Sequence, residues 1–177
     1  MIVVEFNFIA TTFRYKEDDL IDELKEIFCE AGELSVPIHA TNIDGIVIGY
    51  SMMDPIKFIF FLREKLKDVP WEIRYLLRFL PIEKAILTEI SEIKEISLEL
   101  AKKIPIDDSF KIMIEKRHTN LKKINIINEI APFILRKVNL TNPCWILLIE
   151  IIGKYTGITV IKSDLLFSSM IEKRSIE

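Results

Sequence analysis

Residues 144–153, CWILLIEIIG, are the feature that most restricts how this chain can fold. Apolar side chains fill the run without the alternation that a strand with one face in water shows, and Glu150 is its single charged residue. The pattern therefore predicts a strand that is buried on both faces. A strand of this kind indicates a layered domain in which helices cover a sheet.

The segments around this run predict helices interleaved with further strands. Residues 88–104 carry apolar residues at helical spacing, and residues 109–116 alternate as a strand does. Residues 122–138 predict a second helix that Pro132 bends or ends, and residues 155–169 predict one or two more strands. The positions expected to face the core from the second helix are Ile124, Ile127, Ile130, Ile134 and Val138. Together these segments predict an α/β domain.

The first half of the chain predicts a different, α+β domain. Its segments read as strand, helix, strand, strand, helix and strand, which is the order of a ferredoxin-like βαββαβ fold. The strands are expected at residues 2–11, 33–42, 45–52 and 71–82, and the helices at 16–32 and 56–69. Asp54 and Pro55 supply an N-cap and a first helical residue, while Pro37 indicates an edge strand. The expected division is a ferredoxin-like domain over 1–84, an α/β domain over 85–170 and a C-terminal tail over 171–177.

Charge is distributed unevenly along this chain, whose net charge is −3. Residues 1–82 carry 9 Lys/Arg and 14 Asp/Glu, a net charge of −5, whereas residues 83–177 carry 15 and 13, a net charge of +2. Within residues 111–137, seven Lys/Arg accompany only two acids, Glu115 and Glu129. Because salt screens charges beyond about 10 Å, a local basic patch can bind phosphate even on an acidic protein.

Membrane and secreted proteins are disfavoured by the sequence. No apolar run approaches the roughly 20 residues that span a bilayer. Residues 1–12 lack the basic start of a secretion signal and read as a strand. The cysteines, Cys29 and Cys144, make neither a disulfide framework nor a zinc motif, which favours the reducing cytoplasm. We therefore expect a cytoplasmic protein without membrane contact.

Catalytic and cofactor motifs do not occur in the sequence. Its five glycines form neither GxGxxG nor a P-loop, and there is no HExxH, no GxSxG and no zinc-ligand spacing. His39 is expected to have a structural role, either buried or on an edge strand. The acidic pairs Asp18-Asp19 and Asp107-Asp108 are explained by capping and solvation. We therefore expect a binding module and no enzyme, with no cofactor and no metal.

The stretch IEKRHTNLKK, residues 114–123, places a basic cluster where a predicted strand passes into a predicted helix. Cations are unfavourable at a helix N-terminus, whereas the free N–H groups there attract anions, so this position favours phosphate binding. A solvated loop is the alternative interpretation. Asn120 is the expected N-cap in either case. The expected phosphate contacts are Lys116, Arg117, His118, Asn120, Lys122 and Lys123.

Two smaller groups are further candidates for nucleic-acid contacts. Tyr155, beside Lys154, suits stacking on an unpaired base, and the alternative is a tight turn with an exposed aromatic. Arg74 and Arg78 are four residues apart, so that in a strand they share a face and extend the basic patch. The alternative for these arginines is pairing with acids of the N-terminal domain.

Three stretches taken together resemble proteins of the THUMP-domain family. They are RYLLRFLPIEK (74–84), FKIMIEKRHTNLKKINIINEIAPFI (110–134) and VNLTNPCWILLIEIIGKYTGITVI (138–161). A KR-bearing strand enters a helix, a VxLxNP turn leads into an apolar strand ending in glycine, and a TGI strand follows. Order and spacing carry the resemblance, since no single motif is specific. One departure is Cys144, where the family commonly has an acidic residue.

The resemblance implies a ferredoxin-like domain followed by a THUMP domain, and RNA binding without catalysis. Within the family, the chain resembles the stand-alone THUMP proteins that assist tRNA cytidine acetylation. This implies that it binds the acceptor region and 3′ end of tRNA and presents the tRNA to a separate RNA cytidine acetyltransferase. One alternative is a protein-interaction or assembly module that uses the acidic N-terminal domain without binding RNA. An RNA-modifying enzyme with an unrecognised site is the remaining alternative.

Overall fold

The computed structural model describes residues 5–177, which divide into two compact units. The N-terminal unit comprises residues 5–81 together with residues 165–177, and the central unit comprises residues 82–164. Each unit has one five-stranded sheet and its own hydrophobic core. Two sheets with helices confirm the predicted α+β / α/β class. Residues 2–4 of the first predicted strand lie outside the described residues.

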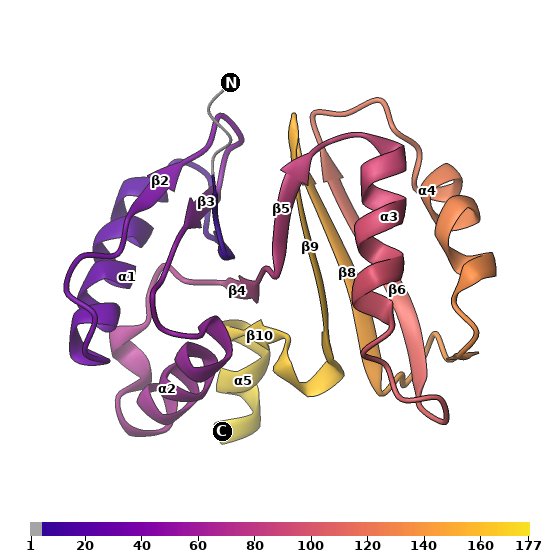
Figure 1. The fold of residues 1–177 in the computed structure, drawn as a ribbon. Helices are drawn as coiled ribbons and strands as arrows, with labels where there is room; N and C mark the ends of the chain where they lie inside the picture. The colour runs from indigo at the N-terminus through magenta and orange to yellow at the C-terminus, as the bar shows by residue number, and fades with distance from the viewer. Residues whose placement is uncertain (1–4) are drawn as a thin grey trace. The chain divides into compact units, whose positions relative to one another are not determined.

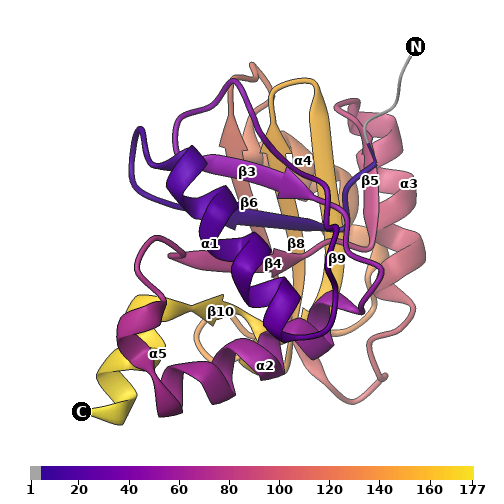
Figure 2. The ribbon, with the colours of Figure 1, turned by 90° about the vertical axis from the view of Figure 1, so that its left-hand side faces the viewer.

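The N-terminal unit has the predicted βαββαβ order (Figures 1 and 2). Its elements are β1 (Phe8–Thr11), α1 (Glu17–Glu30), β2 (Ile38–Ala40), β3 (Ile46–Gly49), α2 (Pro55–Asp68) and β4 (Arg78–Pro81). The sheet order is β10-β4-β1-β3-β2, all its pairs are antiparallel, and β2 lies at the edge, as Pro37 predicted. Helices α1 and α2 cover one face of this sheet (Figure 2).

Local sequence explains the start of α2 and the packing beneath it. The Asp54 side chain accepts a hydrogen bond from the backbone N–H of Ile56, and Pro55 takes the first helical position, as predicted. In the core, the rings of Phe28 and Phe58 stack with their centroids 3.7 Å apart. Gly49 in β3 lets the Phe8 ring lie against the backbone, since a Cβ there would come within 2.1 Å of Cζ.

The predicted strand over 71–82 is wrong for its first seven residues. A 3₁₀ turn, η1 (Pro70–Glu72), comes first, and only Arg78–Pro81 form β4. The buried carboxylate of Glu23 on α1 accepts hydrogen bonds from the backbone N–H groups of residues 74–76. Because a side chain satisfies these N–H groups, the backbone here needs no neighbouring strand.

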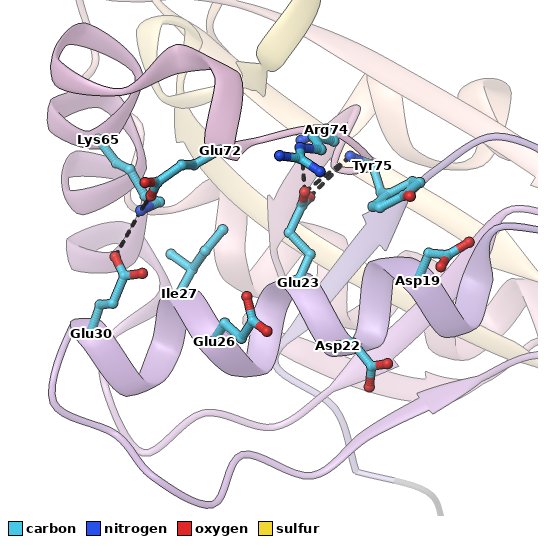
Figure 3. A pocket seen from close by; sticks show the side chains of 10 residues that line it. All are labelled: Asp19, Asp22, Glu23, Glu26, Ile27, Glu30, Lys65, Glu72, Arg74 and Tyr75. Carbon is cyan, nitrogen blue, oxygen red and sulfur yellow. Dashed lines mark hydrogen bonds and ion pairs between the residues drawn. The ribbon is translucent and has the colours of Figure 1, made fainter.

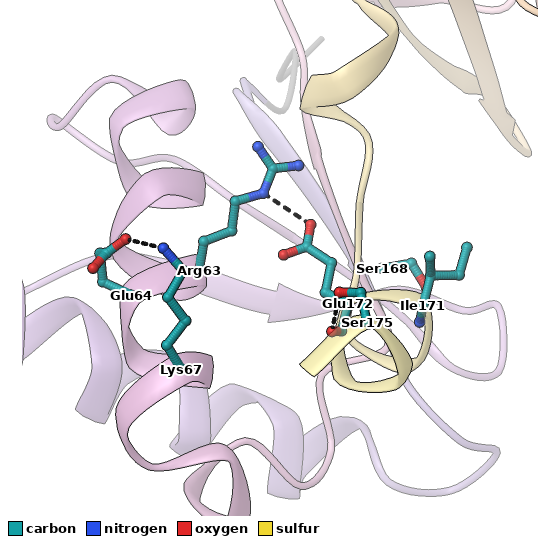
Figure 4. Close-up of polar contacts among 7 residues, drawn as sticks. All are labelled: Arg63, Glu64, Lys67, Ser168, Ile171, Glu172 and Ser175. Atoms are coloured by element: carbon teal, nitrogen blue, oxygen red, sulfur yellow. Dashed lines mark hydrogen bonds and ion pairs between the residues drawn. The ribbon is translucent and has the colours of Figure 1, made fainter. Parts of the chain in front are cut away.

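The C-terminal residues also differ from the prediction, which placed 165–170 in the second domain and left 171–177 as a tail. Strand β10 (Phe167–Ser168) pairs with β4, and α5 (Ser169–Ile176) follows it in the N-terminal unit. An ion pair joins helix α5 to helix α2: Arg63 Nε of α2 lies 2.8 Å from Glu172 Oε1 of α5 (Figure 4). Lys173 Nζ donates to the backbone oxygen of Ile73 at 2.7 Å. These contacts are long-range, so the sequence pattern did not reveal them.

The central unit is a mixed sheet with two helices on one face (Figure 1). Its elements are β5 (Lys84–Leu87), α3 (Ile90–Ala101), β6 (Ser109–Arg117), α4 (Lys123–Ile130), β7 (Lys137–Val138), β8 (Trp145–Ile152) and β9 (Tyr155–Lys162). The sheet order is β5-β9-β8-β6-β7, with β6 parallel to both β7 and β8. Every residue of β8 after Trp145 is buried, as the continuous apolar run predicted. Strand β5 was not predicted.

The predicted helix over 122–138 is shorter than its apolar spacing indicated. It ends at Ile130, where η2 (Ala131–Phe133) begins and Pro132 removes a helical hydrogen bond. Ile126 and Ile130 are its buried residues, whereas Ile124 and Val138 are more than half exposed. The prediction treated residues 122–138 as one continuous helix. The helix ends at Ile130, so the apolar residues after it do not share a helical face with those before it.

Candidate nucleic-acid interface

The carboxyl ends of β6 and β8 bring two of the predicted site segments together. Because these strands are parallel, both end at the same edge of the sheet (Figure 1). Strand β6 ends at Arg117, and the backbone oxygen of Arg117 accepts a hydrogen bond from the N–H of Gly153 at 2.9 Å. Gly153, with φ +68°, turns the chain from β8 into β9, and Lys154 follows it in this turn. The basic junction and Lys154 are therefore neighbours.

The starts of both helices of the central unit lie at this same edge. The N–H of Thr88, just before α3, donates to the backbone oxygen of Lys154 at 2.8 Å, and the hydroxyls of Thr88 and Thr156 are 2.8 Å apart. Helix α4 begins six residues after the end of β6, at Lys123.

Lys154 Nζ lies 5.3 Å from the ring centroid of Tyr155, which is itself half-buried. Tyr155 is therefore less free to stack on a base than an exposed aromatic would be.

The predicted N-cap of α4, Asn120, is wrong. Lys122 occupies the N-cap position, and no side chain caps the helix there. His118 has a left-handed φ of 54°, and the Thr119 hydroxyl accepts a hydrogen bond from the N–H of Leu121 at 3.3 Å. This turn delays the helix by two residues beyond Asn120 and leaves that side chain exposed in the loop. The start of α4 thus presents lysines without a competing capping side chain.

Lys116 and Arg117 lie on opposite faces of the sheet, because successive side chains of a strand alternate. Lys116 shares the face of Ile112 and Ile114, which pack toward the helices, and it is exposed. Arg117 Nη1 donates to Glu150 Oε2 at 2.8 Å, and the Glu150 side chain is completely buried. The predicted pair of phosphate contacts is thereby divided: Lys116 faces solvent, whereas Arg117 neutralises a buried carboxylate.

Four exposed lysines remain at this edge, and within residues 5–177 none of them forms an ion pair. We call these lysines, together with exposed His118, the basic edge: Lys116, His118, Lys122, Lys123 and Lys154. Other lysines of the central unit are compensated, such as Lys94 by Glu129 at 3.3 Å and Lys103 by Glu83. Uncompensated ammonium groups beside the N–H groups at a helix start suit a phosphate-bearing ligand.

Arg74 and Arg78 belong to the N-terminal unit. Arg74 precedes β4, so the two arginines do not share a strand face as predicted. Arg74 is exposed and its Nε donates to the backbone oxygen of Trp71 at 3.2 Å, while Arg78 is half-buried in β4. His39 is exposed on the edge strand β2, one of the two positions expected for it.

An acidic pocket of about 300 Å³ in the N-terminal unit was not predicted (Figure 3). Its carboxylates are Asp19, Asp22, Glu23, Glu26, Glu30 and Glu72, and its other lining residues are Ile27, Lys65, Arg74 and Tyr75. Burial lowers the pKa of Lys65, but hydrogen bonds to Glu30 and Glu72 outweigh burial and raise that pKa above 10.5. The three- and four-residue spacing of acids along α1 was the sequence signal for this pocket.

Among the described residues, no three His, Cys, Asp or Glu side chains gather where they could hold a metal ion. No helix within residues 5–177 has the length and apolarity required to cross a bilayer.

The described residues form a ferredoxin-like unit and a mixed-sheet unit, and the second unit carries the basic edge. Residues 88–161 match the THUMP domain family. The chain therefore carries a THUMP domain, and the whole basic edge lies within the matched residues. THUMP domain-containing protein 1 of Homo sapiens is 30% identical over 143 residues, which cover 75% of this chain and 40% of the relative. This chain thus spans well under half the length of that relative.

Three solved structures share the fold. PH1313 from Pyrococcus horikoshii Ot3 has a TM-score of 0.62 and 15% identity, over 89% of this chain and 55% of that one. TrmN from Thermus thermophilus has a TM-score of 0.58 and 13% identity, over 86% and 44%. A 4-thiouridine synthetase solved as an RNA complex with bound ATP has a TM-score of 0.54 and 19% identity, over 89% and 41%. At these identities the similarity establishes the fold.

Proposed function

We propose that this protein binds tRNA through the basic edge of its THUMP domain and recognises the acceptor region and 3′ end. The observation that carries the proposal is the basic edge, where four exposed lysines that form no ion pair within residues 5–177 gather with His118 near the end of β6 and the start of α4. Phosphate contacts of this kind supply most of the affinity of a protein for a nucleic acid. The 4-thiouridine synthetase, a structure of the same fold solved with RNA, supports the choice of ligand.

We further propose that the protein is a non-catalytic adaptor that presents tRNA to a separate RNA cytidine acetyltransferase. This part rests on the resemblance to stand-alone THUMP proteins and on the sequence, in which catalytic motifs do not occur. The adaptor role is tested by acetylation of tRNA cytidine with purified acetyltransferase, with and without this protein. Stimulation that disappears when the lysines of the basic edge are replaced supports the role, and acetylation by this chain alone contradicts it.

Fluorescence anisotropy with labelled tRNA tests the RNA-binding proposal. One variant replaces the lysines of the basic edge with alanine: Lys116, Lys122, Lys123 and Lys154. A charge-matched control replaces four exposed lysines outside that edge: Lys25, Lys57, Lys84 and Lys162. We expect the first variant to lose at least about a hundredfold in affinity and the control to lose little. Equal losses in both variants contradict a localised interface.

Recognition of the 3′ end is tested with the same tRNA lacking its terminal single-stranded nucleotides. If the end is recognised, the truncated tRNA binds wild-type protein more weakly. Affinity that is unchanged by truncation, yet still depends on the basic edge, means that the protein binds the tRNA elsewhere.

The acidic pocket of the N-terminal unit favours a second function, which is docking of a basic protein segment without RNA. Six carboxylates line that pocket beside two cations. If this is the function, wild-type protein binds tRNA only weakly and without specificity. The double variant Asp22→Lys with Glu26→Lys then loses binding to the protein partner, and its tRNA affinity stays as low as that of the wild type. Specific tRNA binding by the wild type excludes this reading as the main function.

A further inference from the structure

A shallow groove of about 180 Å³ lies between the C-terminal half of α3 and the segment that follows α4. It is lined by Leu98, Ala101, Lys102, Phe133, Ile134, Leu135 and Arg136. Leu135 is 81% exposed at its rim, and Phe133 is also more than half exposed. A large aliphatic side chain held almost entirely in water beside a groove suits contact with another molecule.

Apolar exposure continues beyond the groove along the same stretch of chain. Leu140 is 73% exposed, and Val138 in β7 is more than half exposed. Arg136 Nε donates to the backbone oxygen of Ile104 at 2.8 Å, which joins this stretch to the loop where Ile106 is 74% exposed. Most of these side chains are aliphatic, so they offer little for base stacking, which favours a protein occupant over RNA.

The charges beside the groove indicate the chemistry of that occupant. Its two charged lining residues, Lys102 and Arg136, are both basic, and Lys137 follows directly. The sequence has no Asp or Glu between Glu129 and Glu150. The acids of α3 do not line the groove. A segment that combines apolar side chains with acidic ones is therefore complementary to this surface.

Contacts within the chain hold the groove in shape. Lys94 Nζ on α3 lies 4.4 Å from the ring centroid of Phe133 and 3.3 Å from Glu129 Oε2, which ties η2 to that helix. Arg136 also donates from Nη1 to the backbone oxygen of Leu135 at 3.0 Å. A preformed surface binds a short segment at lower entropic cost than a mobile one.

We propose that this groove docks a short segment of a partner protein that presents apolar side chains flanked by Asp or Glu. The site is separate from the basic edge. Strand β6 starts beside β7, through its Ser109–Lys137 pairing, and ends at Arg117, so about 26 Å of strand separates the two sites. The THUMP domain can therefore hold RNA at one end of its sheet and a protein at the other.

Selection from a random displayed peptide library tests this proposal, with the purified full chain as bait. We expect the enriched peptides to combine apolar residues with Asp or Glu. Their affinity is expected to fall at least about tenfold for Leu135→Asp. The matched control is Leu34→Asp, since Leu34 is 80% exposed but lies in the N-terminal unit, and it is expected to leave affinity unchanged. Both positions are exposed, so neither change is expected to unfold the chain.

A charge exchange provides the second test. Lys102→Glu is expected to lower the affinity for the selected acidic peptides. Peptides in which Lys replaces the acid are expected to restore affinity for the Lys102→Glu variant. The proposal is overturned if enriched peptides bind Leu135→Asp as tightly as wild type, or if they are basic. It is also overturned if Leu135→Asp lowers tRNA affinity as much as Lys116→Ala, or if sedimentation shows a dimer of this chain that Leu135→Asp dissociates.

Discussion

Arg117 and Glu150 form an ion pair between adjacent parallel strands, with Arg117 Nη1 at 2.8 Å from Glu150 Oε2. Glu150 is the one charged residue of the apolar run in β8, and its side chain is completely buried. The pair explains how that run tolerates a carboxylate. It also makes Arg117 a residue that positions the end of β6, where Lys116 and His118 meet the turn at Gly153.

Removal of the Arg117 guanidinium is expected to destabilise the protein. Arg117→Ala removes the guanidinium that pairs with the buried carboxylate of Glu150, at a cost of about 3 kcal/mol in the free energy of unfolding. Urea denaturation measures this change. The matched control is Lys116→Ala, which changes an exposed residue that has no ion pair in the described part of the chain and is expected to cost less than about 0.5 kcal/mol. A small effect of Arg117→Ala, with a large loss of tRNA affinity, shows instead that Arg117 contacts RNA.

The salt dependence of tRNA binding is expected to show how much each lysine of the basic edge contributes to phosphate binding. Single changes of Lys116, Lys122 or Lys154 to alanine lower affinity about threefold to tenfold, because each removes one phosphate contact. Each change also reduces the slope of log K against log salt by about 1. Anisotropy titrations over a series of salt concentrations measure both quantities. Lys162→Ala, outside the edge, is expected to leave the slope unchanged, and an equal change there shows that binding is diffuse.

Glu23 is expected to stabilise the chain before β4. Its carboxylate accepts hydrogen bonds from the backbone N–H groups of Arg74, Tyr75 and Leu76, so Glu23→Ala leaves these donors without a partner. We expect a loss of about 2 kcal/mol in the free energy of unfolding, together with faster amide exchange at residues 74–76. Glu26→Ala is the control, since Glu26 lines the same pocket but is exposed. Unchanged exchange in Glu23→Ala means that other groups hold this segment.

Glu17 is expected to contribute stability that depends on pH. The hydrogen bond from the Gly45 N–H to its carboxylate lowers the pKa of Glu17 below 4.5. The charged form is therefore favoured by folding, so its contribution is present above pH 4.5 and is lost as the pH falls through the lowered pKa. The stability difference between wild type and Glu17→Gln is expected to shrink on acidification. A difference that stays constant between neutral and acidic pH contradicts this assignment, and Glu26→Gln serves as the control.

The ferredoxin-like order, the cap at Asp54 and the buried strand β8 were predictable because each follows from local sequence. Hydrophobic period, capping chemistry and proline geometry act over a few residues, and they are independent of the rest of the fold. The position of the basic cluster between a strand and a helix was predictable for the same reason. The error at Asn120 is also local, since the left-handed backbone of His118 and the turn at Thr119 left no strong sequence signal.

The sequence by itself determined the βαββαβ order of the N-terminal unit, the buried strand β8 and the residues that carry positive charge. Only the tertiary structure decided which of those charges are free. Arg117 forms an ion pair with the Glu150 carboxylate, 33 residues away in the sequence. Lys154, by contrast, lies beside the basic junction because β6 and β8 pair in parallel. Tertiary contacts also place residues 165–177 in the N-terminal unit. Such pairings join residues that are distant in sequence, and their free energies depend on burial and on partners that no local pattern specifies.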